Sequence, residues 1–247
     1  MSCIYLISQQ GSDSWLEDRK GAITASMFGE AISKYKSGAN KGEYLKSARD
    51  YAFKLAYERL SDELLEDPQF NPWQAKRGQM LEPEARLHYE ARRGVLVEQA
   101  GLALTEDRLF GASVDGLVDA DGSIEIKCYL SPSKLSEILL EGKLNEEVVA
   151  QIQGGLWITG RKWCDFVLYC PALKKIGRDL TIMRVERDDE FIAVLEAELL
   201  EFNALVEDYM GRLLDGVSPV VEQIIEKVME PETKPQPASA LGIFGVQ

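Results

Sequence analysis

Apolar residues recur every three or four positions in four long stretches of the chain, which is the spacing of an amphipathic helix. The predicted helices cover residues 42–65, 74–93, 145–159 and 188–216. The second is followed by Gly94, a typical helix end, and the fourth carries a continuous apolar stripe. Further upstream, "GSDSWLEDRKGAITASMFGEAIS" predicts two short helices, the first capped around Ser12 to Ser14 and closed by Gly21, the second capped by Thr24 or Ser26.

The period changes from helical to two between residues 94 and 128, which predicts three or four short strands. "DADG", Asp119 to Gly122, predicts a hairpin turn, and residues 163–170 and 180–187 predict two more strands. This order of elements predicts a single α/β domain with a central mixed sheet flanked by helices. The domain would cover residues 1–230, followed by a flexible proline-rich tail over 231–247.

Composition excludes several kinds of chemistry. The four cysteines form no C-x-x-C pair, and the single histidine, His88, has no nearby nucleophile motif, so a zinc site, a disulfide framework and a histidine base are not expected. The formal net charge of −13 argues against non-specific coating of nucleic acid. It leaves room for an enclosed basic site, and for carboxylates that carry metal ions.

No stretch approaches the ~20 apolar residues that a membrane-spanning helix needs, and "MSCIYLISQQ" lacks the features of a signal peptide. The sequence therefore predicts a cytoplasmic protein without a membrane partner.

The stretch "IEIKC" places Glu125 and Lys127 on one face of a strand, opposite Ile124, Ile126 and Cys128. An ordinary ion pair on a solvated sheet face is the simple interpretation. However, Asp115 in "ASVDGLV" lies in the expected hairpin partner, so that two carboxylates and a lysine can converge. Converging carboxylates repel each other unless a cation such as Mg²⁺ lies between them, and Lys127 would then orient or deprotonate the attacking water.

Two further residues strengthen this hypothesis. Glu82 lies on a helix before the sheet, and Gln151 lies on a helix after it, on the same face as Gly154 and Gly155. The alternatives are a solvated Glu82 that pairs with Arg86 at i+4 and a Gln151 on a polar helix face.

Five motifs occur in one order: "WLEDRKGAITAS", "RGQMLEPEAR", "ASVDGLV", "IEIKC" and "VVAQIQGGLWITGRKW". In this order and spacing the chain, from about Gly11 to Tyr169, resembles the phage-type alkaline exonucleases, which include lambda exonuclease and the YqaJ-like viral recombinases. The resemblance implies a restriction-endonuclease-like core of the PD-(D/E)xK type that cleaves phosphodiester bonds with Mg²⁺ or Mn²⁺, with two ions per site. The proline that often precedes the aspartate in this family is replaced by Val114, a position that shapes the strand and supplies no ligand.

The resemblance also implies a role for each matching residue. Asp115, Glu125 and the carbonyl of Ile126 would bind metal, Lys127 would act on the attacking water, and Glu82 and Gln151 would match the family's helical carboxylate and glutamine. Arg19, Ser26 and Ser113 would hold a 5′ phosphate, and Lys36 would contact the DNA backbone. For Arg19 alone, the alternative is a helix-capping arginine that pairs with a surface carboxylate.

The implied function is ATP-independent 5′-to-3′ digestion of one strand of linear duplex DNA, which leaves a 3′ overhang for a single-strand annealing protein. The implied assembly is a ring-shaped homotrimer. The alternatives are an endonuclease or structure-specific nuclease on the same core, and a non-catalytic module that binds DNA ends; an intact set of Asp115, Glu125 and Lys127 argues against the last.

Overall fold

The structure is a computed structural model that describes residues 3–6, 11–65 and 72–215. Residues 1–210 form one compact unit, and a second unit begins at Gly211. The tail predicted over 231–247, and the last part of the predicted domain, lie outside the described residues. In the described part of the chain, no helix is both long enough and apolar enough to cross a membrane.

The elements alternate between helices and strands along the chain. The helices are α1 (Asp13–Asp18), η1 (Ala25–Met27, a 3₁₀-helix), α2 (Phe28–Ala31), α3 (Lys46–Ser61), α4 (Pro72–Arg93), α5 (Pro132–Leu139), α6 (Glu146–Thr159), η2 (Pro171–Ile176, a 3₁₀-helix) and α7 (Asp189–Leu214). The strands are β1 (Cys3–Leu6), β2 (Ile23–Thr24), β3 (Val97–Glu98), β4 (Leu102–Thr105), β5 (Phe110–Ser113), β6 (Gly116–Val118), β7 (Gly122–Lys127), β8 (Trp163–Tyr169) and β9 (Leu180–Glu186).

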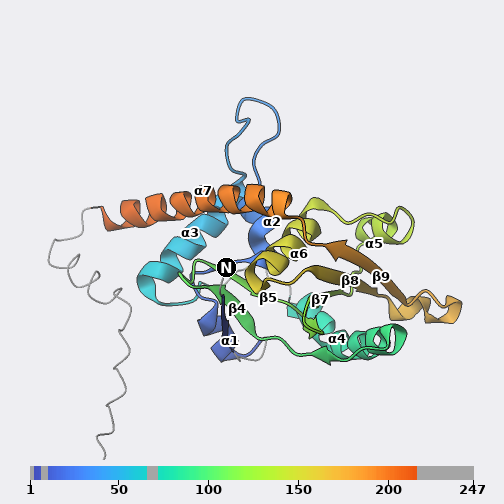
Figure 1. Ribbon diagram of the computed structural model, residues 1–247. Helices are drawn as coiled ribbons and strands as arrows, with labels where there is room; N and C mark the ends of the chain where they lie inside the picture. Colours follow the sequence, from blue (N-terminus) through green and yellow to red (C-terminus); the bar gives the residue numbers. More distant parts are fainter. Residues whose placement is uncertain (1–2, 7–10, 66–71, 216–247) are drawn as a thin grey trace, which may run out of the picture. The chain divides into compact units, whose positions relative to one another are not determined.

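The described strands form two mixed sheets (Figure 1). The larger has the order β3-β6-β7-β8-β9, in which only β7 and β8 are parallel. The smaller has the order β1-β4-β5-β2, with β2 parallel to β5. The α/β class, the mixed sheet flanked by helices and the hairpin at Asp119 are confirmed, and the structure adds that the strands divide between two mixed sheets. The chain leaves the smaller sheet after β5 and enters the larger one at β6, so residues 94–128 hold five strands instead of three or four.

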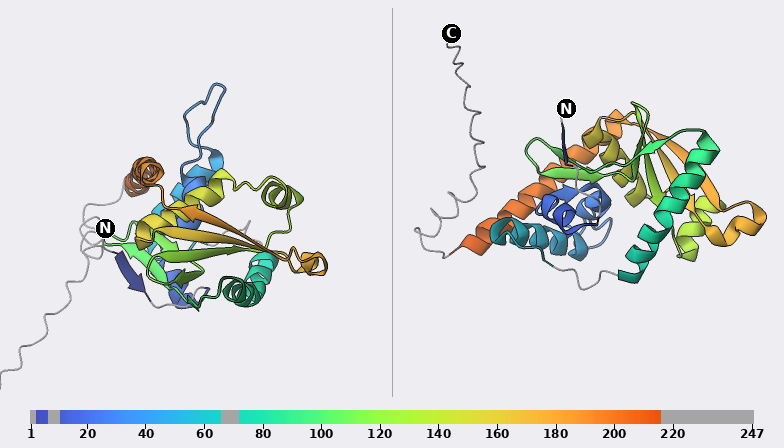
Figure 2. Two further views of the ribbon diagram at one scale, coloured as in Figure 1. Left: turned by 45° about the vertical axis from the view of Figure 1, so that its right-hand side comes forward. Right: turned by 90° about the horizontal axis from the view of Figure 1, so that it is seen from below.

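Helices cover both faces of the larger sheet (Figure 2). On one face, Ala85 and Tyr89 of α4 pack against Ile124 and Val167. On the other face, apolar residues of α5 and α6 pack against β8. The buried members of this second cluster are Ile138, Val148, Ile152, Leu156, Cys164, Phe166, Leu168 and Cys170. The two clusters fix α4 and α6 on opposite sides of β7, the strand that carries "IEIK".

A third core joins α2, α3, α6 and α7 to the smaller sheet, with Phe28, Leu55, Trp157 and Phe202 fully or almost fully buried. Here α6 approaches η1 and α2 closely, because a Cβ at Gly154 would lie only 2.4 Å from the ring of Phe28. The prediction that glycines in α6 permit a close backbone approach is thus confirmed.

Two predicted elements differ from the structure, and one helix was not predicted. The second N-terminal helix begins after Thr24, one of its two predicted cap residues, but it consists only of η1 followed by one turn of α2. The helix predicted from residue 42 begins at Lys46, after a loop closed by the Lys34–Tyr44 bridge. Helix α5 was not predicted, although Ser131 at its N-cap and the following proline are ordinary start signals.

Candidate active site

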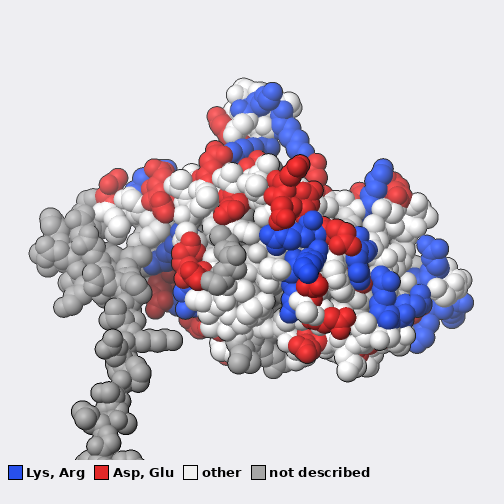
Figure 3. Space-filling model, in the orientation of Figure 1, with Lys and Arg blue, Asp and Glu red and all other residues white. Residues whose placement is uncertain are grey.

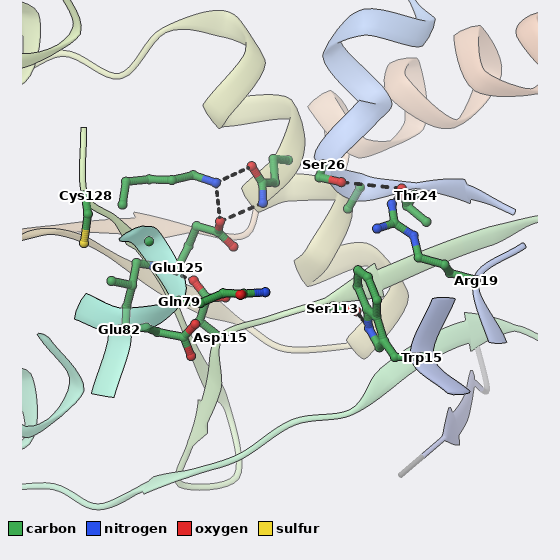
Figure 4. Close-up of a pocket in the computed structure, with 15 residues that line it drawn as sticks. Trp15, Arg19, Thr24, Ser26, Gln79, Glu82, Ser113, Asp115, Glu125 and Cys128 are labelled. Atoms are coloured by element: carbon green, nitrogen blue, oxygen red, sulfur yellow. Dashed lines mark hydrogen bonds and ion pairs between the residues drawn. The ribbon is translucent and has the colours of Figure 1, made fainter. Parts of the chain in front are cut away.

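A cavity of about 300 Å³ lies at the end of β7, between α1, α4, α6 and the bend that joins the two sheets. It is lined by every predicted site residue except Lys36, namely Arg19, Ser26, Glu82, Ser113, Asp115, Glu125, Ile126, Lys127 and Gln151. Since these residues come from six separate parts of the chain, only the fold brings them together. Figure 4 shows two groups that face each other across the cavity, with Glu82, Asp115 and Glu125 on one side and Arg19 and Ser113 on the other.

Asp115 occupies the bend between β5 and β6, and not a hairpin strand as predicted. The bend is fixed by two bonds to β7: the Asp115 amide donates to the carbonyl of Ile124 (3.2 Å), and its Oδ2 accepts from the amide of Ile126 (2.6 Å). Val114 before it is buried and lies under α6, where a Cβ at Gly155 would be 3.3 Å from its Cγ1. The strand-shaping role expected for Val114 fits this packing.

Glu125, Lys127 and Gln151 form a closed triangle of polar contacts (dashed lines beside Glu125 in Figure 4). Lys127 Nζ lies 2.7 Å from Glu125 Oε1 and donates to Gln151 Oε1 (3.0 Å), while Gln151 Nε2 donates to Glu125 Oε1 (2.7 Å). Glu125 is only 5% exposed, so the pair is not the solvated surface ion pair of the simple interpretation. The amide of Gln151 therefore fixes both the carboxylate and the ammonium group in one geometry.

Glu82 fits both of its interpretations, since it lines the cavity and also pairs with Arg86. Arg86 Nη2 donates to Glu82 Oε1 (2.5 Å) and to the backbone carbonyl of Asp115 (3.1 Å). One buried guanidinium group thereby ties the helical carboxylate to the bend that carries Asp115.

Two carboxyl groups and the lysine of the cavity have shifted pKa values. Burial, together with the carboxylates of Glu125 and Glu82, holds the pKa of Asp115 well above its ordinary value. Burial also raises the pKa of Glu82, against the opposing effect of Arg86. Burial by itself would lower the pKa of Lys127, but the carboxylates of Glu125 and Asp115 outweigh it and raise this pKa. Proton-accepting groups are thus crowded on one side of the cavity.

This donor set fits a hard divalent cation. Among the residues that the structure describes, no group of three or more His, Cys, Asp or Glu side chains is arranged to hold a metal ion. A set of two carboxylates with a backbone carbonyl and waters is nevertheless the usual environment of Mg²⁺. Burial and the neighbouring carboxylates together raise the pKa of Asp115, and a cation between the carboxylates would offset the part that comes from their repulsion.

Arg19 occupies the opposite side of the cavity, where its guanidinium group is held by Trp15 and Thr24. The guanidinium carbon lies 4.4 Å from the centre of the Trp15 ring, and Nη2 donates to Thr24 Oγ1 (2.8 Å). Trp15 Nε1 in turn donates to Ser113 Oγ (2.9 Å), and Ser26 Oγ lies 3.5 Å from Thr24 Oγ1. Two serine hydroxyls and one guanidinium group therefore border the same corner.

The backbone of Arg19 caps α1, as the alternative interpretation supposed, but its side chain does not pair with a carboxylate of the described chain. Burial lowers the pKa of Arg19 below its ordinary value. A half-buried guanidinium group with no carboxylate partner among the described residues is suited to an anionic ligand. The N-terminus of the helical segment that begins after Thr24 adds little to anion binding here, because η1 and α2 together span only seven residues.

Lys36 lies outside the cavity, in the loop between Lys34 and Tyr44, where it pairs with Glu146 (3.0 Å). Both side chains of this pair are largely exposed, so the pair adds little stability.

Sequence reasoning did not assign Trp15, Gln79 or Cys128 to the site, although all three line the cavity. Each occurs inside one of the five quoted motifs, within about four residues of a selected residue. Their proximity was the available signal, but the face on which each lies depends on how α1, α4 and β7 are packed.

The chain is similar to a known protein family and to solved structures. The sequence model of the YqaJ-like viral recombinase domain family matches residues 14–162. The alkaline exonuclease LHK-Exo from Laribacter hongkongensis is 30% identical, with a TM-score of 0.70 over 88% of this chain and 100% of that one. The complex of LHK-Exo with dAMP gives 31% identity and a TM-score of 0.72 over 86% and 100%.

A phage related exonuclease from Haemophilus somnus 129PT shares the fold, with 19% identity and a TM-score of 0.57 over 80% of this chain and 96% of that one. No significant match was found among curated proteins. Because the family model matches more than half of the chain and LHK-Exo matches over its whole length, the chain belongs to the phage-type alkaline exonuclease family, with a YqaJ-like viral recombinase domain and a restriction-endonuclease-like fold.

Proposed function

We propose that the protein is a metal-dependent, ATP-independent exonuclease that digests one strand of linear duplex DNA from its 5′ end. The observation that carries this proposal is the arrangement of one cavity. Carboxylates and a lysine lie on one side of it, and on the other side lies the guanidinium group of Arg19, which pairs with no carboxylate of the described residues. The similarity to LHK-Exo, an alkaline exonuclease that has been solved in complex with dAMP, supports the same activity.

In this proposal Asp115, Glu125 and the carbonyl of Ile126 hold Mg²⁺, for which Mn²⁺ can substitute, with two ions per site. The metal supplies Lewis-acid polarisation of the scissile phosphate and lowers the pKa of water. Asp115 is held in place for this role by the amide of Ile126, and Glu125 by Gln151.

Lys127 is the proposed residue that orients the attacking water and holds a proton near the phosphate. Its ammonium group is positioned by Glu125 and Gln151, so it enters the reaction with little reorganisation. Glu82 borders the same space and is anchored by Arg86, which places a second proton acceptor near the leaving group or the metal ligands.

Arg19, Ser26 and Ser113 are the proposed ligands of the terminal 5′ phosphate, one nucleotide away from the scissile bond. A phosphate at this corner would receive charge-assisted hydrogen bonds from the guanidinium group and further bonds from the two hydroxyls. Lys36 would contact the DNA backbone after it gives up its exposed pair with Glu146.

The product would be a 3′ overhang, suited to a single-strand annealing protein as partner in recombination. We further propose that the protein works in the cytoplasm as a ring-shaped homotrimer around its duplex.

The decisive experiment compares four substrates: linear duplex with a 5′ phosphate, linear duplex with a 5′ hydroxyl, duplex labelled at its 3′ ends, and closed circular duplex. With Mg²⁺ we expect mononucleotides from the 5′ ends, a strong preference for the 5′ phosphate, no cleavage of the circle and no activity in EDTA. Cleavage of the circle would identify an endonuclease, and early loss of the 3′ label would contradict the proposed polarity.

Arg19→Ala tests the phosphate corner within the same assay. Because the guanidinium group contributes charge-assisted bonds to the terminal phosphate only, the variant should reduce the preference for the 5′ phosphate by about tenfold or more. Arg49→Ala, which removes an exposed arginine of α3, is the matched control and should leave the preference unchanged. An Arg19→Ala variant with the full preference would remove this residue from the site.

A further inference from the structure

The connection between β8 and β9 projects a group of basic side chains beyond the end of the larger sheet. Lys174, Lys175 and Arg178 lie within five residues in and after η2, and all three are exposed. We call them the basic tip. None of the three forms an ion pair with the described residues, whereas other exposed lysines such as Lys46 and Lys162 pair with Asp50 and Asp121.

The basic tip is also held in a defined shape. The amide of Cys170 donates to the carbonyl of Asp179 (2.7 Å) at the base, and Asp179 is bound by His88 of α4 (3.2 Å). Within the connection, the amide of Gly177 donates to the carbonyl of Lys174 (3.0 Å). Leu173 of η2 packs against the edge of the α5 and α6 cluster, but no residue of η2 is fully buried, and Lys174 and Lys175 stay exposed.

The position of the basic tip follows from the sheet register. Strands β7 and β8 are parallel, and Lys127 lies opposite Leu168, so both strands reach the same edge of the sheet. Pro171, where η2 begins, is three residues past Leu168, roughly 10 Å further at the ~3.3 Å rise of a strand. Figure 3 shows lysine and arginine gathered at this end of the face in view.

This edge is the side of the cavity away from Arg19. Along the cavity, Arg19 and Ser113 come first, then Asp115 and Glu125, and then Cys128, which directly follows β7 (Figure 4). In the proposed function, a DNA strand has its 5′ phosphate at Arg19 and its scissile phosphate at Asp115. The rest of this DNA strand would then continue toward the edge of the sheet from which the basic tip projects.

We propose that the basic tip binds the phosphate backbone of the intact duplex ahead of the scissile bond. At ~3.4 Å per base pair, a reach of about 10 Å or more corresponds to contacts about three to six base pairs ahead. Unpaired cations fit this role because they bind phosphates without first losing a carboxylate partner, and they offset the long-range repulsion of a chain with a net charge of −13. The inference rests on the proposed exonuclease function.

The test is the double variant K174Q/K175Q with K46Q/K162Q as matched control, since both remove two exposed lysines and the control pairs lie elsewhere. For K174Q/K175Q we expect a KM for linear duplex about tenfold higher at physiological salt, a kcat within about twofold of wild type, and a salt dependence of binding reduced by about two phosphate contacts. The control should match wild type in all three quantities, and both variants should keep the preference for a 5′ phosphate.

Neutral methylphosphonate linkages three to six base pairs ahead of the scissile bond give an independent readout. They should weaken binding of DNA by the wild type and have little further effect on binding by K174Q/K175Q. In the variant the lysine charges that contact these phosphates are already missing, so removing the phosphate charges takes away no further contact. Equal KM, salt dependence and methylphosphonate effect in K174Q/K175Q and the control would overturn the inference, as would a change of oligomeric state confined to K174Q/K175Q. Duplex binding is also measured in EDTA, where no cleavage is expected, so the inference can be tested separately from the proposed function. Failure of the proposed function would appear as a wild type that binds duplex but releases no nucleotides with Mg²⁺.

Discussion

At the scale of residues, the two cations of the cavity differ in whether a carboxylate of the described residues pairs with them. Lys127 is in contact with Glu125, so its charge is compensated inside the protein and its position is fixed. Arg19 is half-buried against Trp15 and makes no ion pair with a carboxylate of the described residues, and burial lowers its pKa. In the proposed function, the terminal phosphate of the substrate supplies the opposite charge.

The first prediction at this scale concerns Asp115 and Lys127. Asp115→Ala and Lys127→Ala should each lower kcat by about a thousandfold or more, because each removes a group that acts on the reacting phosphate or the attacking water. The double variant should be scarcely slower than either single variant, since residues that act as one unit are not additive. Single-turnover digestion of linear duplex measures all three rates.

The fold of these variants is checked by urea unfolding, because Lys127→Ala leaves the buried Glu125 without its cation. Lys127→Gln keeps a hydrogen-bond donor beside Glu125 and serves if the alanine variant is unstable. Substantial Mg²⁺-dependent activity in folded Asp115→Ala or Lys127→Ala would refute the assignment.

At the scale of elements, the site depends on how closely α6 approaches its neighbours. Gln151 reaches Glu125 from α6, and one turn later Gly154 lies against Phe28. Helix α4 is fixed on the other face of the sheet by Tyr89, whose hydroxyl donates to the fully buried Asp165 (2.8 Å). Both helices are thus anchored away from the cavity by packing that has no part in the chemistry.

Gly154→Ala tests the role of this packing. The added methyl group would meet the Phe28 ring at 2.4 Å, so the variant should be less stable by about 1–3 kcal/mol. Gly211→Ala in α7 makes the same chemical change where no atom lies within 4 Å, and it should be neutral or stabilise by up to about 1 kcal/mol. Urea unfolding of both variants measures the difference; equal stabilities would show that α6 can shift at no cost.

At the scale of the whole molecule, an acidic chain must bind a polyanion. The net charge of −13 opposes DNA over most of the surface, while the described structure keeps basic groups at particular places such as the corner around Arg19 and the basic tip. A ring of subunits would concentrate such groups around one duplex and direct the acidic surface outward.

We therefore expect a stable homotrimer with processive digestion, since a closed ring cannot leave its duplex between successive cleavages. Light scattering at working concentrations measures the mass of the assembly, and digestion in the presence of excess competitor duplex measures processivity. A stable monomer that remains processive would contradict the ring.

The sequence by itself determined the long helices, the hairpin before β7 and the identity of most residues around the cavity. These features are encoded locally, in helical or twofold periodicity, in turn residues such as "DADG", and in motifs in which Asp115, Glu125 and Lys127 stand close together in the chain. For the same reason, the family could be recognised from five short stretches.

Only the tertiary structure decided how the chain divides into two sheets, that Asp115 lies on the bend between them, and which side chains complete the cavity. Ile23 and Thr24, which lie between the two short N-terminal helices, form a strand that pairs with β5, and the packing around this strand buries Ile23 completely. Trp15 and Arg19 reach the cavity only because α1 packs beside Ser113, almost a hundred residues later in the chain. Such contacts depend on long-range packing, which periodicity and spacing do not encode.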